Sequence, residues 1–212
     1  TDVGAFEDTF KGKDIIFYTE THQSPTSTLP SVTGYRWESV HRQTTRSEYS
    51  SRGSGGVAIL YKEDLRPIVQ VVRCDEEARY MWVRIHTEGP RDLFVAVCYF
   101  APASSSYACP RGQSPYTILD EDIMEFARDG DILLVGDFNA RTASKQVSFF
   151  DMTDEVYREL DAEDLGIQRV SMDAEVTEYG EYLLEMGGAH GLAILNGLPR
   201  WQGSGAFTCH PL

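Results

Sequence analysis

The apolar runs of this chain have the length of β-strands, and that length limits the folds open to it. Clear examples are residues 57–61, 93–100 and 132–135. A helix that crosses a bilayer needs roughly 20 apolar residues, and no run in the sequence approaches that. The runs therefore predict a core built from β-sheet and no membrane partner.

The order of the expected elements favours sheets covered by helices. We expect strands at 14–19, 57–61, 67–73, 80–86, 93–100, 131–135 and 191–196, and helices at 114–129, 153–164 and 176–189. The early strands follow one another directly, and the later elements alternate. This mixture is typical of an α+β or layered α/β domain. A length of 212 residues suits one domain, and 42% apolar with 25% charged residues is ordinary for a globular protein.

The net charge of −14 argues at first against a nucleic-acid partner, because phosphate backbones attract Lys and Arg. The charge is unevenly distributed, however. Residues 151–185 hold 12 acidic and 2 basic side chains, and the rest of the chain holds 21 acidic and 17 basic ones. The acidity therefore belongs mainly to one segment. The absence of a strong basic patch predicts weak DNA affinity.

The cysteines and the N-terminal residues predict an intracellular protein. The four cysteines form no CxxC pair and no zinc-like spacing with the five histidines, which favours reduced thiols. Residues 1–11 lack the apolar centre of a signal peptide. The chain does not begin with Met, which we interpret as a trimmed or partial sequence.

Polar side chains with catalytic potential follow three of the expected strands. Glu20 ends the first, Tyr99 ends the fifth, and Asp137 with Asn139 ends the strand after the first helix. Ligands of sheet proteins often gather beyond strand ends. Carboxylates there could hold a divalent cation together with a substrate phosphate, and an amide could donate to a phosphate oxygen. The pattern is therefore suited to phosphodiester hydrolysis.

Taken singly, each of these residues also has a structural interpretation. Glu20 could be a solvated carboxylate at a strand end, and Tyr99 could pack in the core or at its rim. The Gly136-Asp137-Phe138-Asn139 segment could be a strand followed by an Asx turn. Residues 52–56, rich in glycine, lack the ending of a nucleotide-binding loop and are interpreted as a flexible turn.

Six segments, in this order, resemble one known family. They are residues 17–22 (FYTETH), 55–59 (GGVAI), 97–102 (VCYFAP), 136–141 (GDFNAR), 191–197 (GLAILNG) and 205–208 (GAFT). The chain resembles the endonuclease/exonuclease/phosphatase superfamily, whose fold is that of DNase I, over nearly its whole length. It is most similar to the endonuclease domains of non-LTR retrotransposons.

The resemblance implies an α/β fold, a four-layer sandwich of two packed mixed β-sheets flanked by helices. It implies cleavage of DNA phosphodiesters with Mg²⁺, or Mn²⁺, held by Glu20. Asp137 matches the aspartate that orients or deprotonates water, and Asn139 matches the asparagine that contacts the scissile phosphate. The family's Tyr-x-Pro spacing places Phe100 at the tyrosine position, and a shift of one residue recovers Tyr99. The family also implies a downstream reverse transcriptase domain and a nuclear location.

The chain departs from the family pattern at both ends. An asparagine-bearing first strand and the final aspartate and histidine motifs are absent, and His210 lacks the Ser-Asp that precedes the family's histidine. We therefore expect residues 1–212 to form a single but incomplete domain with impaired activity or none. Two alternatives stay open at this point: a non-catalytic retroelement remnant, and a phosphatase or phosphodiesterase on the same fold.

Overall fold

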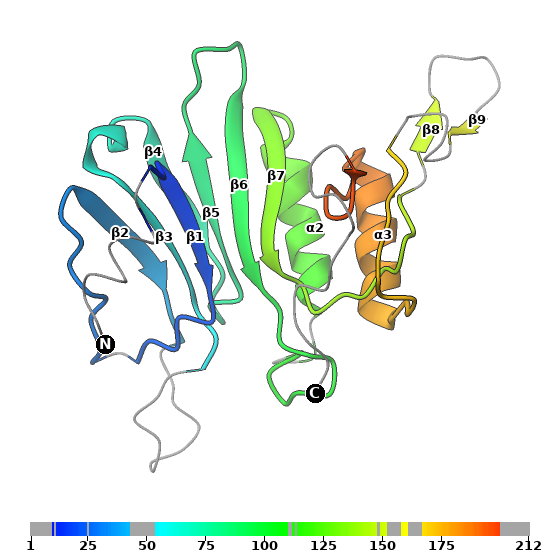
Figure 1. Ribbon diagram of the computed structural model, residues 1–212, viewed down its shortest axis with the longest axis horizontal. Helices are drawn as coiled ribbons and strands as arrows, with labels where there is room; N and C mark the ends of the chain where they lie inside the picture. The colour runs from blue at the N-terminus through cyan, green and yellow to red at the C-terminus, as the bar shows by residue number, and fades with distance from the viewer. Residues whose placement is uncertain are drawn as a thin grey trace. The chain divides into compact units, whose positions relative to one another are not determined.

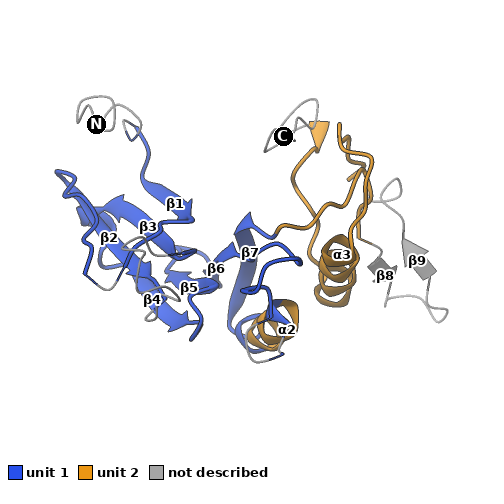
Figure 2. Ribbon diagram, turned by 90° about the horizontal axis from the view of Figure 1, so that it is seen from below, with its two compact units in different colours: residues 1–115, 125–138 blue, residues 116–124, 139–212 orange. Residues whose placement is uncertain are grey.

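A computed structural model describes most of the chain. It covers residues 10, 12–24, 26–42, 54–109, 112, 114–147 and 167–199, together with the backbone of two short strands at 149–151 and 158–160. The chain divides into two compact units (Figure 2): residues 1–115 with 125–138, and residues 116–124 with 139–212. The expectation of a single domain stays a prediction.

Two β-sheets make up the first unit (Figure 1). One sheet has the order β1-β3-β2 and is antiparallel, with β1 at Ile15–Thr19, β2 at Tyr35–Val40 and β3 at Val57–Lys62. The other has the order β4-β5-β6-β7, with β4 at Val69–Cys74, β5 at Tyr80–Ile85, β6 at Asp92–Tyr99 and β7 at Gly130–Asp137. A short 3-10 helix, η1 at Glu63–Leu65, follows β3. Among the described strands of this sheet, β6 and β7 alone pair in parallel, so the second sheet is mixed.

The two sheets pack face to face through alternate residues of their strands, since side chains of a strand point to opposite faces in turn. Ile59 and Tyr61 of the first sheet lie in one buried cluster with Met81 and Val83 of the second, and with Val97 of β6. The opposite face of the first sheet buries Leu60 against Phe10 and Val32. The expected α/β fold with two packed sheets, the fold class of DNase I, is confirmed.

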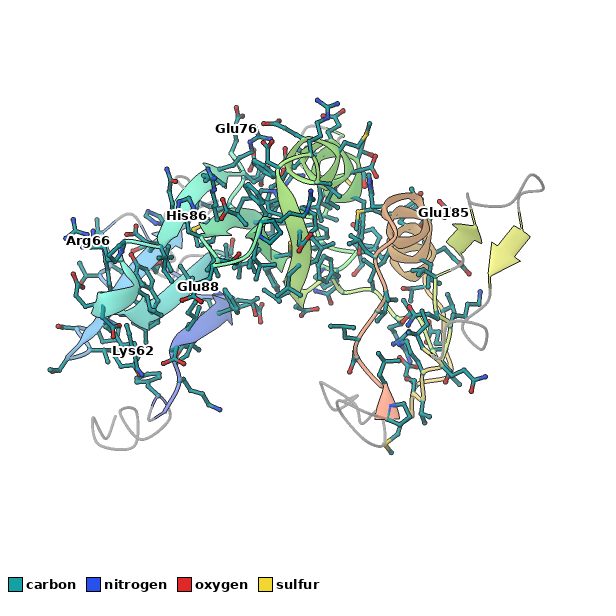
Figure 3. The ribbon with its side chains drawn as sticks, turned by 90° about the horizontal axis from the view of Figure 1, so that it is seen from above. Lys62, Arg66, Glu76, His86, Glu88 and Glu185 are labelled. Carbon is teal, nitrogen blue, oxygen red and sulfur yellow. The ribbon has the colours of Figure 1, made fainter. Side chains whose placement is uncertain are left out.

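Aromatic rings cover the outer face of the second sheet. The Phe126 ring, at the end of helix α2 (Pro115–Phe126), stacks on Phe94 at 4.9 Å and lies 4.9 Å from the Trp82 ring. Charged side chains such as Lys62 and Glu76 point away from the sheets (Figure 3).

The second unit contains most of α2, helix α3 (Glu178–His190) and the antiparallel pair β8 (Phe149–Asp151) and β9 (Arg158–Leu160). Helix α3 begins at Thr177, whose hydroxyl accepts a hydrogen bond from the Gly180 N–H, and it ends at Gly191 with a φ of +66°. Both ends follow the common capping rules, which explains why the sequence predicts this helix well. None of the described helices has the length and apolarity that crossing a bilayer needs.

Two of the expected elements differ from the structure, and one observed strand was not expected. The helix expected at 153–164 is wrong at residues 158–160, which form β9, and its other residues lie outside the described ones. The strand expected at 191–196 is wrong because the Gln146 side-chain amide occupies the backbone N–H and C=O of Ile194, at 2.8 and 2.9 Å. Strand β2 was not predicted, because charged residues interrupt its apolar pattern.

Candidate active site

Tyr99 and Glu20 bring the two sheets together at one end of the sandwich. Tyr99 is the last residue of β6, two residues beyond Val97, so it faces the core between the sheets. Glu20 directly follows β1 in the other sheet. The Tyr99 hydroxyl donates a hydrogen bond of 2.5 Å to Glu20 Oε1, across 79 positions of sequence. Two residues that the sequence predicts for the site thus meet.

A pair of glycines holds the backbone around Glu20. Glu20 has a φ of +52°, a conformation that costs side-chain-bearing residues about 1 kcal/mol or more. The following N–H groups, of Thr21 and His22, donate to the carbonyls of Gly56 and Gly55 at 3.2 and 2.9 Å. A Cβ on Gly56 would lie 2.7 Å from Thr21 Oγ1. Gly55 and Gly56 therefore support the Glu20 loop, which the interpretation of this segment as a flexible turn did not anticipate.

The structure places Tyr99 and Phe100, the two candidates for the tyrosine position, in different surroundings. Phe100 is fully buried, with its ring 5.4 Å from that of Phe138 in an edge-on contact. The pKa of Tyr99 is raised well above its ordinary value, first by burial, then by the hydrogen bond to Glu20 and by the negative charges of Glu20 and Asp137. The Tyr99 hydroxyl therefore keeps its proton at neutral pH and acts as a donor.

Asp137 lies beside Tyr99 because β6 and β7 run in parallel. The two residues are partners in the strand register, and the Phe100 N–H donates to the Asp137 carbonyl at 2.9 Å. The preceding residue, Gly136, has a φ of +123°, and a Cβ there would lie 2.0 Å from the Cys98 carbonyl oxygen. Only glycine fits at this point, so the approach of β7 to β6 just before Asp137 depends on it.

Asn139 stands two residues further on and opens the second unit. Its φ of +47° is a left-handed conformation that asparagine tolerates better than most residues. Two residues after Asn139, two hydrogen bonds fix the backbone of Arg141. Its N–H donates to the Thr177 hydroxyl at 3.1 Å, and its carbonyl accepts from the Thr177 N–H at 3.0 Å. The structure thus groups Glu20, Tyr99 and Asp137 within one unit, while Asn139 belongs to the other unit.

The donor set around Tyr99 is compatible with a divalent cation. Within the described residues, no three Asp, Glu, His or Cys side chains come close enough together to hold a metal by themselves. Both carboxylates near Tyr99, those of Glu20 and Asp137, are oxygen ligands of the kind that Mg²⁺ prefers. Since Mg²⁺ usually takes one or two carboxylates together with waters and substrate phosphate, these residues fit the ion that the sequence implies.

One charged residue near Tyr99 was not singled out from the sequence. Arg42 is only 8% exposed, and its positive charge acts on the ionisation of Tyr99. The sequence signal for Arg42 is its position two residues after β2, a strand that the sequence patterns do not predict. Such a signal has no specificity before the strand is known.

Comparison with known proteins gives three results. The sequence profile described as the Endonuclease/Exonuclease/phosphatase family matches residues 2–210. None of the curated proteins matches the chain. Among solved structures, the chain is similar to the 3′ phosphatase NExo from Neisseria bound to product DNA hairpin, with 17% identity and a TM-score of 0.44 over 66% of this chain. The match covers 54% of that protein, so this chain spans about half its length.

The profile match covers almost the entire sequence, including every residue of the Glu20, Tyr99 and Asp137 group. This protein belongs to the Endonuclease/Exonuclease/phosphatase family.

Proposed function

We propose that this chain carries the catalytic centre of a divalent-metal-dependent enzyme that hydrolyses DNA phosphodiesters, of the retroelement endonuclease type. One observation carries the proposal: Glu20, Tyr99 and Asp137 meet at the ends of three strands from two packed sheets in a member of this family. A set of strand-end residues held on a rigid scaffold is the usual arrangement for catalysis on a sheet.

The roles of the residues follow from their chemistry. Glu20 would hold the divalent cation, which supplies positive charge to polarise a phosphoryl oxygen. The Tyr99 hydroxyl donates to Glu20 Oε1 and thereby restricts the carboxylate to one orientation. Asp137, an acceptor on the same sheet end, would orient the attacking water and take its proton. Asn139 would donate from its amide to a phosphate oxygen without adding charge.

The retroelement type rests on the motifs. The Glu20-Thr21-His22 segment and the Leu195-Asn196-Gly197 segment are those that resemble retrotransposon endonucleases rather than phosphatases. In that setting the parent polypeptide would carry a reverse transcriptase domain downstream and would act in the nucleus. The −14 net charge is consistent with weak DNA binding that depends on a metal ion, because the ion supplies positive charge at the site.

Nicking of supercoiled plasmid DNA tests the proposal. We expect the activity of this chain to be impaired, as the sequence predicts, so the purified chain should convert supercoiled DNA only slowly to the open circular form in Mg²⁺ or Mn²⁺, and not at all in EDTA. Asp137→Ala and Glu20→Gln should each lower the rate about 100-fold or more, since each removes a group of the reacting centre. Asp131→Ala is the matched control, because this carboxylate lies on the same strand β7 but pairs with Arg91 at the surface.

The same preparation should be offered 3′-phosphorylated oligonucleotides and inositol phosphates. Release of phosphate from these without nicking of DNA would replace the endonuclease with a phosphatase on the same fold. Nicking that survives Asp137→Ala, or no hydrolysis of any of these substrates, would overturn the proposal and favour the non-catalytic alternative.

A further inference from the structure

Arg42, which follows β2, is buried close to the proposed reaction centre. The guanidinium carbon lies 4.3 Å from the centroid of the Tyr107 ring, within range of a cation–π interaction. Its Nε donates to the Glu77 carbonyl oxygen at 3.0 Å, and its Nη1 donates to the Ser54 hydroxyl at 3.4 Å. The side chain is thus held in one place by three segments of the first unit.

The positive charge of Arg42 has no ion-pair partner in the described part of the chain. A second buried arginine nearby, Arg79, differs in this respect: its guanidinium makes two hydrogen bonds of 2.8 Å to the carboxylate of Asp75. Glu77 acts on Arg42 through its charge, but the hydrogen bond to Arg42 uses its backbone carbonyl. Because a buried charge whose hydrogen bonds go to neutral acceptors is costly, an anion that binds beside Arg42 would lower that cost.

The position of Arg42 indicates where such an anion would bind. A Cβ on Gly55 would lie 4.0 Å from the Arg42 guanidinium carbon and 3.4 Å from Cδ1 of Tyr99. Arg42 and Tyr99 therefore flank the same glycine, on the side of the sandwich where Tyr99 meets Glu20. The guanidinium has five N–H donors, and the two acceptors above take only two of them.

We propose that Arg42 binds a phosphate group of the nucleic-acid substrate beside Tyr99. A guanidinium is planar and presents paired donors that match phosphate oxygens, and its charge would offset the nearby carboxylates of Glu20 and Asp137 toward an anionic substrate. Arg42 would thus add a phosphate contact to a chain whose net charge is −14. This inference rests on the proposed function, because it takes the DNA phosphodiester as the ligand.

The test measures binding rather than cleavage. A fluorescent DNA duplex is titrated with the full chain in Mg²⁺, by anisotropy, at several salt concentrations, and every protein compared carries Asp137→Ala so that the DNA is not cut. Arg42→Met should weaken binding about 10-fold and lower the slope of log affinity against log salt by about 1, since one phosphate contact is lost. Arg42→Lys should keep the slope while losing part of the affinity, because the charge remains and the paired donors do not.

Arg66→Gln serves as the control, since Arg66 has a side chain that is 64% exposed and a long contact of 4.0 Å to Glu63. It should leave both affinity and slope unchanged, and circular dichroism on every variant separates misfolding from lost binding. Two results would overturn the inference even if the wild type nicks DNA. One is a salt-dependence slope of folded Arg42→Met equal to that of the protein that keeps Arg42. The other is an Arg42→Lys slope lowered as much as that of Arg42→Met. A slope that depends on Arg42 without any nicking would leave the phosphate contact standing and reject the nuclease.

Discussion

Substitution of Gly136 by alanine should damage both the fold and the site, because this residue lies between Cys98 of β6 and Asp137. Two effects act there. The φ of +123° is open to glycine and strained for other residues, and a Cβ would lie 2.0 Å from the Cys98 carbonyl oxygen. The obstructing atom belongs to the backbone of a neighbouring buried strand, so no side chain can rotate away to make room.

The magnitude follows from adding these two effects. Backbone strain at a conformation of this kind costs about 1–3 kcal/mol. Forcing extra volume into a packed core costs about 1–3 kcal/mol more. Gly136→Ala should therefore lower the free energy of unfolding by about 2–6 kcal/mol. Gly34→Ala isolates the first effect, because Gly34 has a φ of +78° and a Cβ there would meet nothing within 4 Å. Its expected cost is about 1–2 kcal/mol.

Urea unfolding followed by circular dichroism measures both variants on the same scale. Because Gly136 precedes Asp137, its alanine variant should also lose plasmid nicking under conditions in which it is still folded, whereas Gly34→Ala should keep it. If Gly136→Ala unfolds at the same urea concentration as Gly34→Ala, β6 and β7 do not approach each other closely at Cys98 in solution. Gly136 would then not be needed to position Asp137.

Three further predictions concern charged and ionisable groups. Asp75→Asn breaks the buried ion pair with Arg79 and should lower the free energy of unfolding in urea by about 3 kcal/mol or more. The control Asp131→Asn breaks an exposed pair with Arg91 and should lower it by less than about 1 kcal/mol. Equal losses for the two variants would contradict the burial of Asp75. The Arg84 hydrogen bond lowers the pKa of Asp92 below 3.8, so this carboxylate stabilises the fold above that pH and the contribution disappears as pH falls further. Asp92→Asn should therefore flatten the acid side of the stability profile, and an unchanged profile would refute the assignment. Because the pKa of Tyr99 is raised from 10.0, its contribution to stability is present below pH 10 and is lost as pH rises above it. The difference in phenolate absorbance between the wild type and folded Tyr99→Phe reports the ionisation of Tyr99 alone. This difference should show no titration near pH 10, and a titration there would contradict the buried hydrogen bond to Glu20.

Local patterns predicted the elements whose own residues determine their structure. The strands β3, β6 and β7 are continuous apolar runs, and helix α3 has a capping threonine and a terminal glycine. The prediction failed where partners from elsewhere decide the conformation. Residues 158–160 lie in a stretch rich in helix-forming residues, yet they pair with β8. The backbone of Ile194 is occupied by Gln146, 48 residues away, rather than by a neighbouring strand.

The candidate site shows the same division. Sequence patterns were enough to place Glu20, Tyr99 and Asp137 at strand ends and to show the resemblance to the family to which the profile match assigns the chain. The packing of the fold was needed to show that the Tyr99 hydroxyl, and not the buried Phe100, meets Glu20, and that Arg42 lies close to Tyr99 with no carboxylate partner among the described residues. The physical reason is that strand periodicity is a local property, readable residue by residue. The meeting of side chains 79 positions apart depends on how two sheets pack, and sequence spacing carries no direct record of that packing.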